Sequence, residues 1–314
     1  MITWGVNALN HGSSLAVFKD GEYLAGIVSN NDILPQGQID AAINDHGFPD
    51  RIYWYEHPWL KKARQVYAGQ YKTAINMSVL PSRKLKEWGL SRAPVTYTPH
   101  HASHAAAGYF TSPFNHAAIV VLDAIGEFEC ATIWKGVNGN LRKVWSRSYP
   151  HSLGLFYSAF TKLIGLEPIK QEHLLQQMSA QGDASRYYHE VSAYINNTVE
   201  LTRNLHRGVQ DWPFEIDRLQ DQCDIAAAVQ QVFEEQVQNI MHIASTLTGS
   251  HNLVYMGGCA MNSQANKLIA PMWEHIWSLP NPGDPSSALG AVLYHTKQRV
   301  THDWGSVKHI EIKI

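Results

Sequence analysis

The chain begins with short apolar runs that are separated by polar, glycine-containing turns. Residues 2–6 and 15–18 are apolar runs that predict two strands, with a polar turn at 7–14 between them and a hairpin signal at Asp20-Gly21. The same order returns further along, with strands predicted at 117–122, 130–134 and 141–145 and polar turns at 123–127 and 136–139. These two units predict a duplicated α/β core whose two loops face each other across a cleft.

Two longer patterns extend this picture. In residues 217–248 the apolar side chains recur close to every 3.6 residues, which predicts one long amphipathic helix. Residues 251–256 form an apolar strand that leads into Gly257-Gly258-Cys-Ala-Met-Asn262, where glycines before a helix would let a ligand approach free backbone amides. The end of the chain, residues 300–314, is predicted to be a surface appendage with an edge strand at 309–314.

Composition narrows the class of protein. The 314 residues are 45% hydrophobic and 17% charged, as is typical of globular proteins. No apolar run reaches the roughly 18 residues of a membrane span, and the N-terminus lacks signal-peptide features, so we expect a soluble cytoplasmic protein with no membrane partner. Cys130, Cys223 and Cys259 are too few and too far apart for a disulfide framework or a four-thiolate zinc site.

The charge is unevenly distributed along the chain. The net charge is −2, but residues 59–92 carry eight basic residues and one acid, which makes this segment +7 and the remainder −9. Together with Trp59, Tyr67, Tyr71 and Trp88, these cations would form a surface that attracts and stacks a phosphate-bearing acceptor such as a nucleotide or nucleic acid. The alternative is a solvated helix face that balances the acidic remainder. The spacing is compatible with both interpretations.

The most informative stretch is Thr98-Pro99-His100-His101-Ala-Ser-His104-Ala. Pro99 and the small residues after it predict a helix, on which His100 and His104 share one face while His101 is rotated by about 100°. Two imidazoles at this spacing can chelate one metal ion. The alternative is a pair of capping or hydrogen-bonded histidines. The metalloprotease pattern HExxH is absent, because no Glu lies between the two ligands.

An ordered set of motifs connects the chain to a known family. Along residues 2–296 they are Gly5-Val-Asn7 with His11-Gly-Ser-Ser, His100-His101-Ala-Ser-His104-Ala, Ser112-Pro113-Phe114, Asp123-Ala-Ile-Gly126-Glu127, Ser152-Leu153-Gly154-Leu-Phe-Tyr157-Ser158, Gly257-Gly258-Cys-Ala-Met-Asn262 and Pro282-Gly283-Asp284-Pro-Ser-Ser-Ala-Leu-Gly290-Ala291. This set resembles the nodulation and antibiotic O-carbamoyltransferase family, whose catalytic domain is similar to the tRNA threonylcarbamoyladenosine enzyme. The resemblance implies an actin-like ATPase (ASKHA) fold with an N-terminal lobe at 1–110, a C-terminal lobe at 111–300 and a tail at 301–314.

The resemblance also implies a site. A divalent metal, Fe2+ or a similar ion, would be bound by His100, His104, Asp123 and Asp284 together with phosphate oxygens. ATP or carbamoyl-adenylate would contact Asn7, Gly126, Gly257, Gly258 and Asn262, and carbamoyl phosphate would be the ultimate donor. The predicted catalytic residues are His11, Asp123 and Glu127, with His11 as the base or as the group that orients the acceptor.

The chain departs from the family pattern at several places. Gly12 stands where the family has an Asp, residues 29–37 lack its Glu-Glu-Arg segment, and Leu174 replaces a lysine between the retained Glu172 and Gly182. Typical members also continue into a C-terminal adenylate-forming domain, which this sequence does not contain. We therefore expect carbamoyl-adenylate to come from a separate adenylate-forming partner protein, or to be made on this chain by another route.

Three functions are compatible with the sequence. The first is O-carbamoyl transfer to a sugar, nucleoside, modified base or small metabolite. The second is a catalytically idle nucleotide-binding protein that regulates or assembles with others, which the departures favour and the retained ligand-type residues oppose. The third, tRNA threonylcarbamoyl transfer, fits less well because residues 112–114, 123–127 and 152–158 follow the O-carbamoyl branch.

Overall fold

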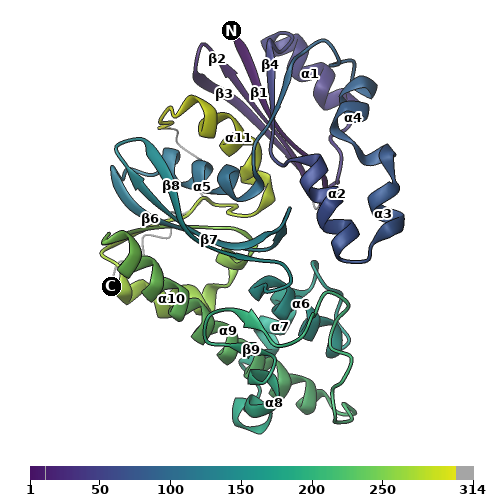
Figure 1. Cartoon of the computed structure of the whole chain (residues 1–314), viewed down its shortest axis with the longest axis vertical. Helices are drawn as coiled ribbons and strands as arrows, with labels where there is room; N and C mark the ends of the chain where they lie inside the picture. The colour runs from purple at the N-terminus through teal and green to yellow at the C-terminus, as the bar shows by residue number, and fades with distance from the viewer. Residues whose placement is uncertain (11, 302–314) are drawn as a thin grey trace.

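The computed structural model describes residues 1–10 and 12–301, which form two five-stranded sheets, one in each half of the chain (Figure 1). The first sheet has the order β3-β2-β1-β4-β5, formed by Glu22–Ser29, Gly12–Lys19, Ile2–Asn10, Arg51–Trp54 and Val95–Tyr97. β1 pairs antiparallel with β2 and parallel with β4. The first half is therefore a mixed sheet that begins with an antiparallel meander.

The second sheet repeats this arrangement. Its order is β12-β11-β6-β7-β8, formed by His275–Trp277, Asn252–Met256, His116–Gly126, Glu129–Val137 and Asn140–Ser148. β6 pairs antiparallel with β7 and parallel with β11, as β1 does with β2 and β4. The predicted duplicated α/β core is confirmed.

The turns predicted at 7–14 and 123–127 are too long. β1 continues to Asn10, β2 begins at Gly12 and β6 continues to Gly126, so most of these polar residues belong to strands. The strand pairing is irregular at both places, between Asn7 and Asn10 and between Leu122 and Gly126. An irregular strand end presents polar side chains at the sheet edge, so its sequence resembles that of a turn.

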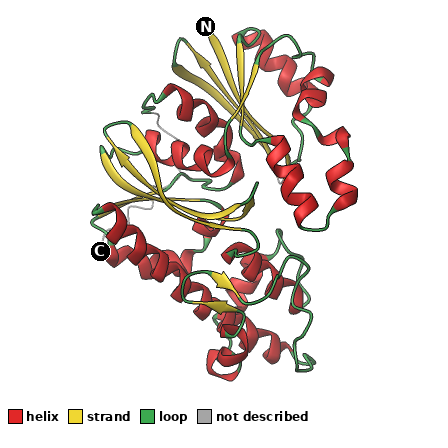
Figure 2. Cartoon of the chain, in the orientation of Figure 1, coloured by secondary structure: helices red, strands yellow, loops and turns green. Residues whose placement is uncertain are grey.

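Two helices lie between the sheets (Figure 2): α5, His100–Thr111, and α11, Ser287–Thr296. Their buried side chains pack in one core with residues of β2 and β6. A Cβ atom on Gly5 would lie 1.8 Å from the carbonyl oxygen of Ala288, and one on Gly290 would lie 1.8 Å from that of Ser103. The close packing of α11 against β1 and α5 therefore requires residues without a side chain.

The remaining helices cover the outer faces. In the first half they are α1 (Gln36–His46), α2 (Pro58–Tyr67), α3 (Tyr71–Ile75) and α4 (Pro81–Glu87), and in the second half α6 (Leu153–Leu163), α7 (Glu172–Ser179), α8 (Tyr188–Ser192), α9 (Leu219–Thr248) and α10 (Ser263–Ile269), with the short pair β9 (Ile195–Asn196) and β10 (Glu200–Leu201). α9 is the long helix that the apolar period predicts, and its buried side chains pack on the second sheet. No described helix has the length and apolar character to cross a membrane. The strand predicted at 309–314 lies outside the described residues.

Candidate active site

Four ligand-type side chains from distant parts of the chain meet at one point. His100 and His104 lie on α5, Asp123 lies in the irregular part of β6, and Asp284 begins the 3-10 helix η5 (Asp284–Ser286) that precedes α11. One nitrogen or oxygen atom of each lies within 4.8 Å of those of the others. Nε2 of His100 is 3.0 Å from Oδ2 of Asp123 and 3.3 Å from Oδ1 of Asp284. The structure brings together the four residues for which the sequence predicts a metal site.

This donor set fits a divalent transition metal. Nε2 of His104 lies 3.1 Å from Nε2 of His100 and 3.4 Å from Oδ1 of Asp284, so both rings direct the same nitrogen toward a shared position. Two imidazoles with two carboxylates suit ions such as iron or zinc better than calcium, which prefers oxygen ligands alone.

His101 points away from this group, as its rotation on the helix predicts. Its Nδ1 lies 2.9 Å from Oγ1 of Thr132 on β7. Burial lowers the pKa of His101 well below its usual range, which keeps this ring neutral. The site therefore uses the first and last histidines of the motif.

Opposite charges favour the ionised forms of His100, Asp123 and Asp284. Burial opposes a charge on His100, but Asp284 and Asp123 outweigh it and raise the pKa of His100 well above its usual range. Burial also opposes ionisation of Asp123, but the hydrogen bond from His100 lowers the pKa of Asp123 to about 2. The same histidine holds the pKa of Asp284 well below its usual range despite burial. Two carboxylates that keep their charge at neutral pH attract a cation.

Three predicted cofactor-binding glycines surround Asp123. A Cβ atom on Gly126 would lie 2.4 Å from a ring carbon of His100, and one on Gly257, which has φ of 90°, would lie 2.2 Å from the carbonyl oxygen of Leu122. Gly258 donates its N–H to Oδ1 of Asp123 at 3.3 Å. These glycines therefore position the ligand-type residues, in addition to any contact they make with a nucleotide.

The first sheet reaches the site through the end of β1. Nδ2 of the buried Asn7 donates to the carbonyl oxygen of Asp284 at 3.0 Å, and Nδ2 of Asn10 donates to Oδ2 of Asp284 at 3.3 Å. Oδ1 of Asn7 is buried and has no hydrogen-bond partner. Asn7, predicted as a cofactor contact, thus also attaches the Asp284 loop to β1. His11, the predicted base, lies outside the described residues.

Glu127 lies beside this group in the turn after β6, with φ of 53°. Its carboxylate accepts a hydrogen bond from the backbone N–H of His57, and its carbonyl oxygen accepts one from Nε of Arg64 at 3.2 Å. Burial raises the pKa of Glu127 to about 7. Glu127 therefore connects the second sheet to the segment that leads into α2, a role that its sequence position did not indicate.

Sequence analysis missed Tyr55. This residue follows β4 and is fully buried, with its ring 5.3 Å from the ring of His100. Its hydroxyl lies close enough to the Asn10 side chain for Asn10 to lower the pKa of Tyr55, but it makes no hydrogen bond of ordinary geometry. Burial, together with the charges of Glu56 and Asp284, raises the pKa of Tyr55 well above its usual range, so the hydroxyl keeps its proton and is a donor. The consecutive β-branched and aromatic residues from Ile52 to Tyr55 would have indicated this strand, whose carboxyl end meets the site.

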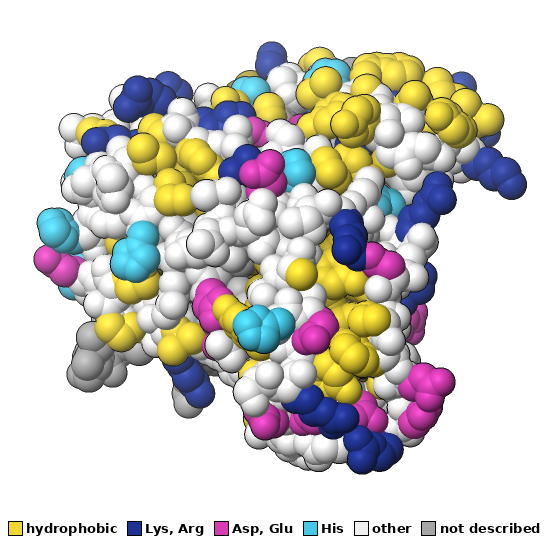
Figure 3. All heavy atoms as spheres, turned by 60° about the horizontal axis from the view of Figure 1, so that its bottom comes forward, with side chains coloured by type: hydrophobic (Ala, Val, Ile, Leu, Met, Phe, Trp, Pro, Cys, Tyr) yellow, Lys and Arg dark blue, Asp and Glu magenta, His cyan; other side chains and the backbone are white. Residues whose placement is uncertain are grey.

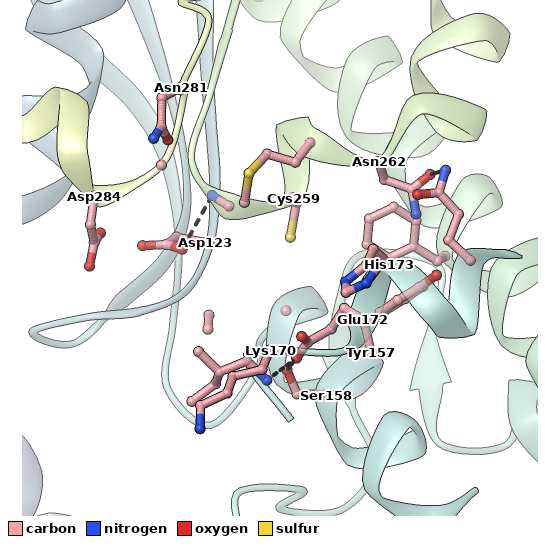
Figure 4. A pocket seen from close by; sticks show the side chains of 18 of the residues that line it. Asp123, Tyr157, Ser158, Lys170, Glu172, His173, Cys259, Asn262, Asn281 and Asp284 are labelled. Carbon is pink, nitrogen blue, oxygen red and sulfur yellow. Dashed lines mark hydrogen bonds between the residues drawn. The ribbon is translucent and has the colours of Figure 1, made fainter. Parts of the chain in front are cut away.

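A cavity of about 460 Å³ extends from Asp123 and Asp284 toward α7 and α10 (Figure 4). Its far wall carries Tyr157, Glu172, His173 and Asn262, and Lys170 lies at its edge in the figure. The polar residues on this wall that sequence analysis did not single out are Lys170, His173 and Gln176. A space of this size accommodates a nucleotide.

Asn262 and the Leu174 region form part of this far wall. Oδ1 of Asn262 caps α10 by accepting from the N–H of Ala265 at 3.0 Å, and Nδ2 donates to Oε1 of Gln230 at 3.0 Å. Leu174 does not line the cavity, whereas Lys170, four positions earlier in the sequence and before the start of α7, does. The cavity wall therefore contains a cation, Lys170, although not at the position where the family has its lysine.

The basic segment departs from each of the two predictions at particular residues. Nζ of Lys62 donates to the carbonyl oxygens of Thr73 and Asn76, and Lys62 and Arg64 are both buried. They therefore do not belong to a solvated face. Trp88 is only 4% exposed and packs in the core of the first half, so it is not part of an aromatic stacking surface.

Two mixed sheets around a pair of central helices, with the site between their strand ends, form the actin-like ATPase fold, which confirms the predicted fold. Component A of (R)-2-hydroxyglutaryl-CoA dehydratase from Acidaminococcus fermentans has this fold, with a TM-score of 0.51 and 12% identity over 95% of this chain and 99% of that one. The chain belongs to the family described as carbamoyltransferase N-terminus, whose model matches residues 59–293.

Two relatives illustrate the family. The uncharacterised protein sll1178 of Synechocystis is 27% identical over 92% of this chain and 56% of its own length. Nodulation protein NolNO of Sinorhizobium fredii is 22% identical over 91% of this chain and 46% of its own length. The chain thus spans about half the length of these relatives. The predicted family is confirmed.

Proposed function

We propose that this chain transfers a carbamoyl group from carbamoyl-adenylate to the hydroxyl of a sugar, nucleoside, modified base or small metabolite. The observation that supports this most is the convergence of His100, His104, Asp123 and Asp284 at one end of a nucleotide-sized cavity. In a member of a carbamoyltransferase family, this arrangement suits a bound phosphate anhydride whose phosphate lies at the charged end.

The bound donor would lie along the cavity. Its adenosine would contact Asn262 and the backbone of Gly258, and its phosphate would lie near Asp123 and Asp284. Because both carboxylates are negative, the phosphate needs a cation between them and itself. A divalent ion such as Fe2+ held by the four residues would neutralise the charge that develops on the leaving phosphate.

The reaction is an acyl substitution. The oxygen of the acceptor hydroxyl forms a bond to the carbamoyl carbon, the bond from that carbon to the phosphate oxygen breaks, and AMP leaves with the electron pair. The hydroxyl proton passes to a base, for which His11 stays our predicted residue. The Tyr55 hydroxyl, which makes no hydrogen bond of ordinary geometry, would donate its proton to a ligand oxygen beside His100.

The donor would originate from carbamoyl phosphate and ATP. The relatives are about twice as long as the segment they share with this chain. The proposal therefore includes an adenylate-forming activity that works together with this chain. A separate partner protein remains our expectation for that activity.

The test is a transfer assay with synthetic carbamoyl-adenylate and separate acceptors: a hexose, a nucleoside and a tRNA. Mass spectrometry should detect a carbamate ester on one acceptor. The variant Asp284→Asn keeps the side-chain size but removes a charge, and it should lose at least 100-fold in rate, whereas the exposed control Asp45→Asn should not. Tight nucleotide binding without product on any acceptor would instead support the idle nucleotide-binding protein.

A further inference from the structure

Helix α2 has its polar and apolar sides reversed relative to an ordinary surface helix. Its buried side contains Lys62, Arg64 and Gln65. Its exposed side contains Trp59, Leu60, Ala63, Val66 and Tyr67. These five positions fall within an arc of about 120° when each residue turns by about 100°. The helix therefore exposes an almost continuous apolar stripe.

The stripe extends onto the next helix. Tyr71 and Ile75 of α3 are 64% and 75% exposed, and Trp59 and Tyr67 of α2 are 55% and 69% exposed. Figure 3 shows hydrophobic side chains covering the upper right of the molecule, the side on which Figure 1 places α2 and α3. We call the surface formed by Trp59, Leu60, Val66, Tyr67, Tyr71 and Ile75 the α2–α3 face. Apolar patches of this kind in folded proteins mark interaction sites.

The buried cations show why the chain maintains this orientation. Nζ of Lys62 donates to a carbonyl oxygen of α3 and to that of the residue that follows the helix, and Arg64 donates to Glu127 of the second half and to Gln70. Turning the helix over would leave these groups without partners, which is costly for buried charges. The apolar residues are consequently fixed on the outside.

From this geometry we propose that the α2–α3 face binds a protein partner that presents an apolar segment flanked by acidic residues. Lys72, Lys86 and Arg92 of the basic segment are exposed and form no ion pair within the described residues. Lys72 lies on α3 next to Tyr71, so it supplies positive charge at the face that an acidic partner would complement. The inference does not depend on the reaction proposed above.

Two other occupants fit less well. In a symmetric dimer through this face, the +7 segments of two copies would lie close together and repel each other. A membrane-surface helix needs cations along its own polar side, but Lys62 and Arg64 of α2 are buried in internal hydrogen bonds. Exposed aromatic residues such as Trp59, Tyr67 and Tyr71 are instead typical of protein interfaces.

The test uses photo-crosslinking in cells of the source organism. Because Cys130, Cys223 and Cys259 are all buried, the variant Val66→Cys carries one exposed thiol to which a benzophenone label can be attached. The variant Leu247→Cys is the matched control, because Leu247 is an exposed apolar residue in the last turn of a helix, as Val66 is. The labelled proteins are introduced into cells and irradiated, and crosslinked proteins are identified by mass spectrometry.

A protein crosslinked from position 66 and not from 247 is then purified and its affinity measured by calorimetry. We expect an acidic protein whose Kd rises at least ten-fold with Val66→Asp, is unchanged with Leu247→Asp and rises with salt. Both Asp variants should keep the parent metal content and melting temperature. Three outcomes would each overturn the proposal. The first is a crosslink only to a second copy, and the second is the absence of any crosslink specific to position 66. The third is binding of the chain to vesicles with 30% phosphatidylglycerol that Val66→Asp abolishes.

Discussion

The Nε2 atoms of His100 and His104 lie 3.1 Å apart. Two unprotonated ring nitrogens at this distance repel each other, so a proton or a metal ion has to lie between them. The carboxylates of Asp123 and Asp284 stand on the same side of the pair, at 3.0 and 3.3 Å from Nε2 of His100. Either a hydrogen bond between the two rings or a bound cation therefore accounts for this distance.

From this arrangement we predict one divalent metal ion per chain. His100→Ala and His104→Ala each remove one nitrogen ligand and should lower the metal content to below a tenth of the parent value, measured by elemental analysis after dialysis. His101→Ala should leave the content unchanged, because this ring is directed toward Thr132. Circular dichroism controls for folding in all three variants. Equal metal in the three folded variants would contradict the assignment.

The hydroxyl of Tyr55 predicts opposite effects on stability and on binding. Because the hydroxyl is buried and makes no hydrogen bond of ordinary geometry, with only the Asn10 side chain close to it, Tyr55→Phe should raise the free energy of unfolding by about 1 kcal/mol, measured by urea denaturation. If the hydroxyl serves a ligand, the same change should weaken nucleotide binding by about ten-fold in calorimetry. Tyr109→Phe is the control, since that hydroxyl donates to the carbonyl oxygen of Asn115 and its loss should reduce stability alone. Unchanged affinity in Tyr55→Phe would exclude contact with the nucleotide.

The contact between α5 and α11 predicts that Gly290 is intolerant of substitution. A Cβ atom there would lie 1.8 Å from the carbonyl oxygen of Ser103, so the two helices would have to separate. Gly290→Ala should lower the free energy of unfolding by about 3 kcal/mol or more. Gly37→Ala is the matched control, because nothing lies within 4 Å of a Cβ atom at that α1 position, and it should raise stability by about 0.5–1 kcal/mol. Denaturant titration of both variants tests this contrast.

Asp224 predicts a loss of stability in acid. Burial opposes its ionisation, but hydrogen bonds from the N–H of Asp183 and from the side chains of Gln220 and Arg186 outweigh this effect and lower the pKa of Asp224. Since the folded pKa lies below the ordinary value of 3.8, the contribution of Asp224 to stability is present above pH 3.8 and is lost as the pH falls through the folded pKa.

The variant Asp224→Asn removes this titration. It should lower the free energy of unfolding by about 1–3 kcal/mol at pH 7, because the charge-assisted hydrogen bonds are weakened. Its melting temperature should fall less steeply than that of the parent chain below pH 4. If both proteins show the same acid slope, Asp224 does not carry the pH dependence.

The sequence predicts those parts of the fold that depend on neighbouring residues. The helix spacing of His100 and His104 and the apolar period of α9 are local properties, and both are present in the structure. The pairing of Asp123 with Asp284 is not local, because 161 positions separate them along the chain. It was predicted from the ordered family motifs and not from periodicity.

Other features depend on contacts that no local pattern reports. Lys62 and Arg64 look like solvent-facing cations in the sequence, but they are buried because carbonyl oxygens of α3 and of Glu127 satisfy them. Tyr55 was missed because its place beside the site depends on contacts with β1 and with His100 of α5, which are distant in the sequence. Polar residues in the irregular ends of β1 and β6 were mistaken for turns, since polarity alone does not distinguish a strand edge from a loop.

The bridge at Glu127 has a thermodynamic consequence. This residue is held by the N–H of His57 and by the guanidinium of Arg64, and both holding groups belong to the segment that carries the α2–α3 face. If a ligand beside His100 shifts Glu127, it changes the equilibrium position of α2. By thermodynamic linkage, a molecule that binds α2 then changes the affinity of the cavity for its ligand. The ligand changes the affinity of α2 for that molecule by the same factor. Binding in the cavity and binding at the α2–α3 face would then be coupled through Glu127 alone.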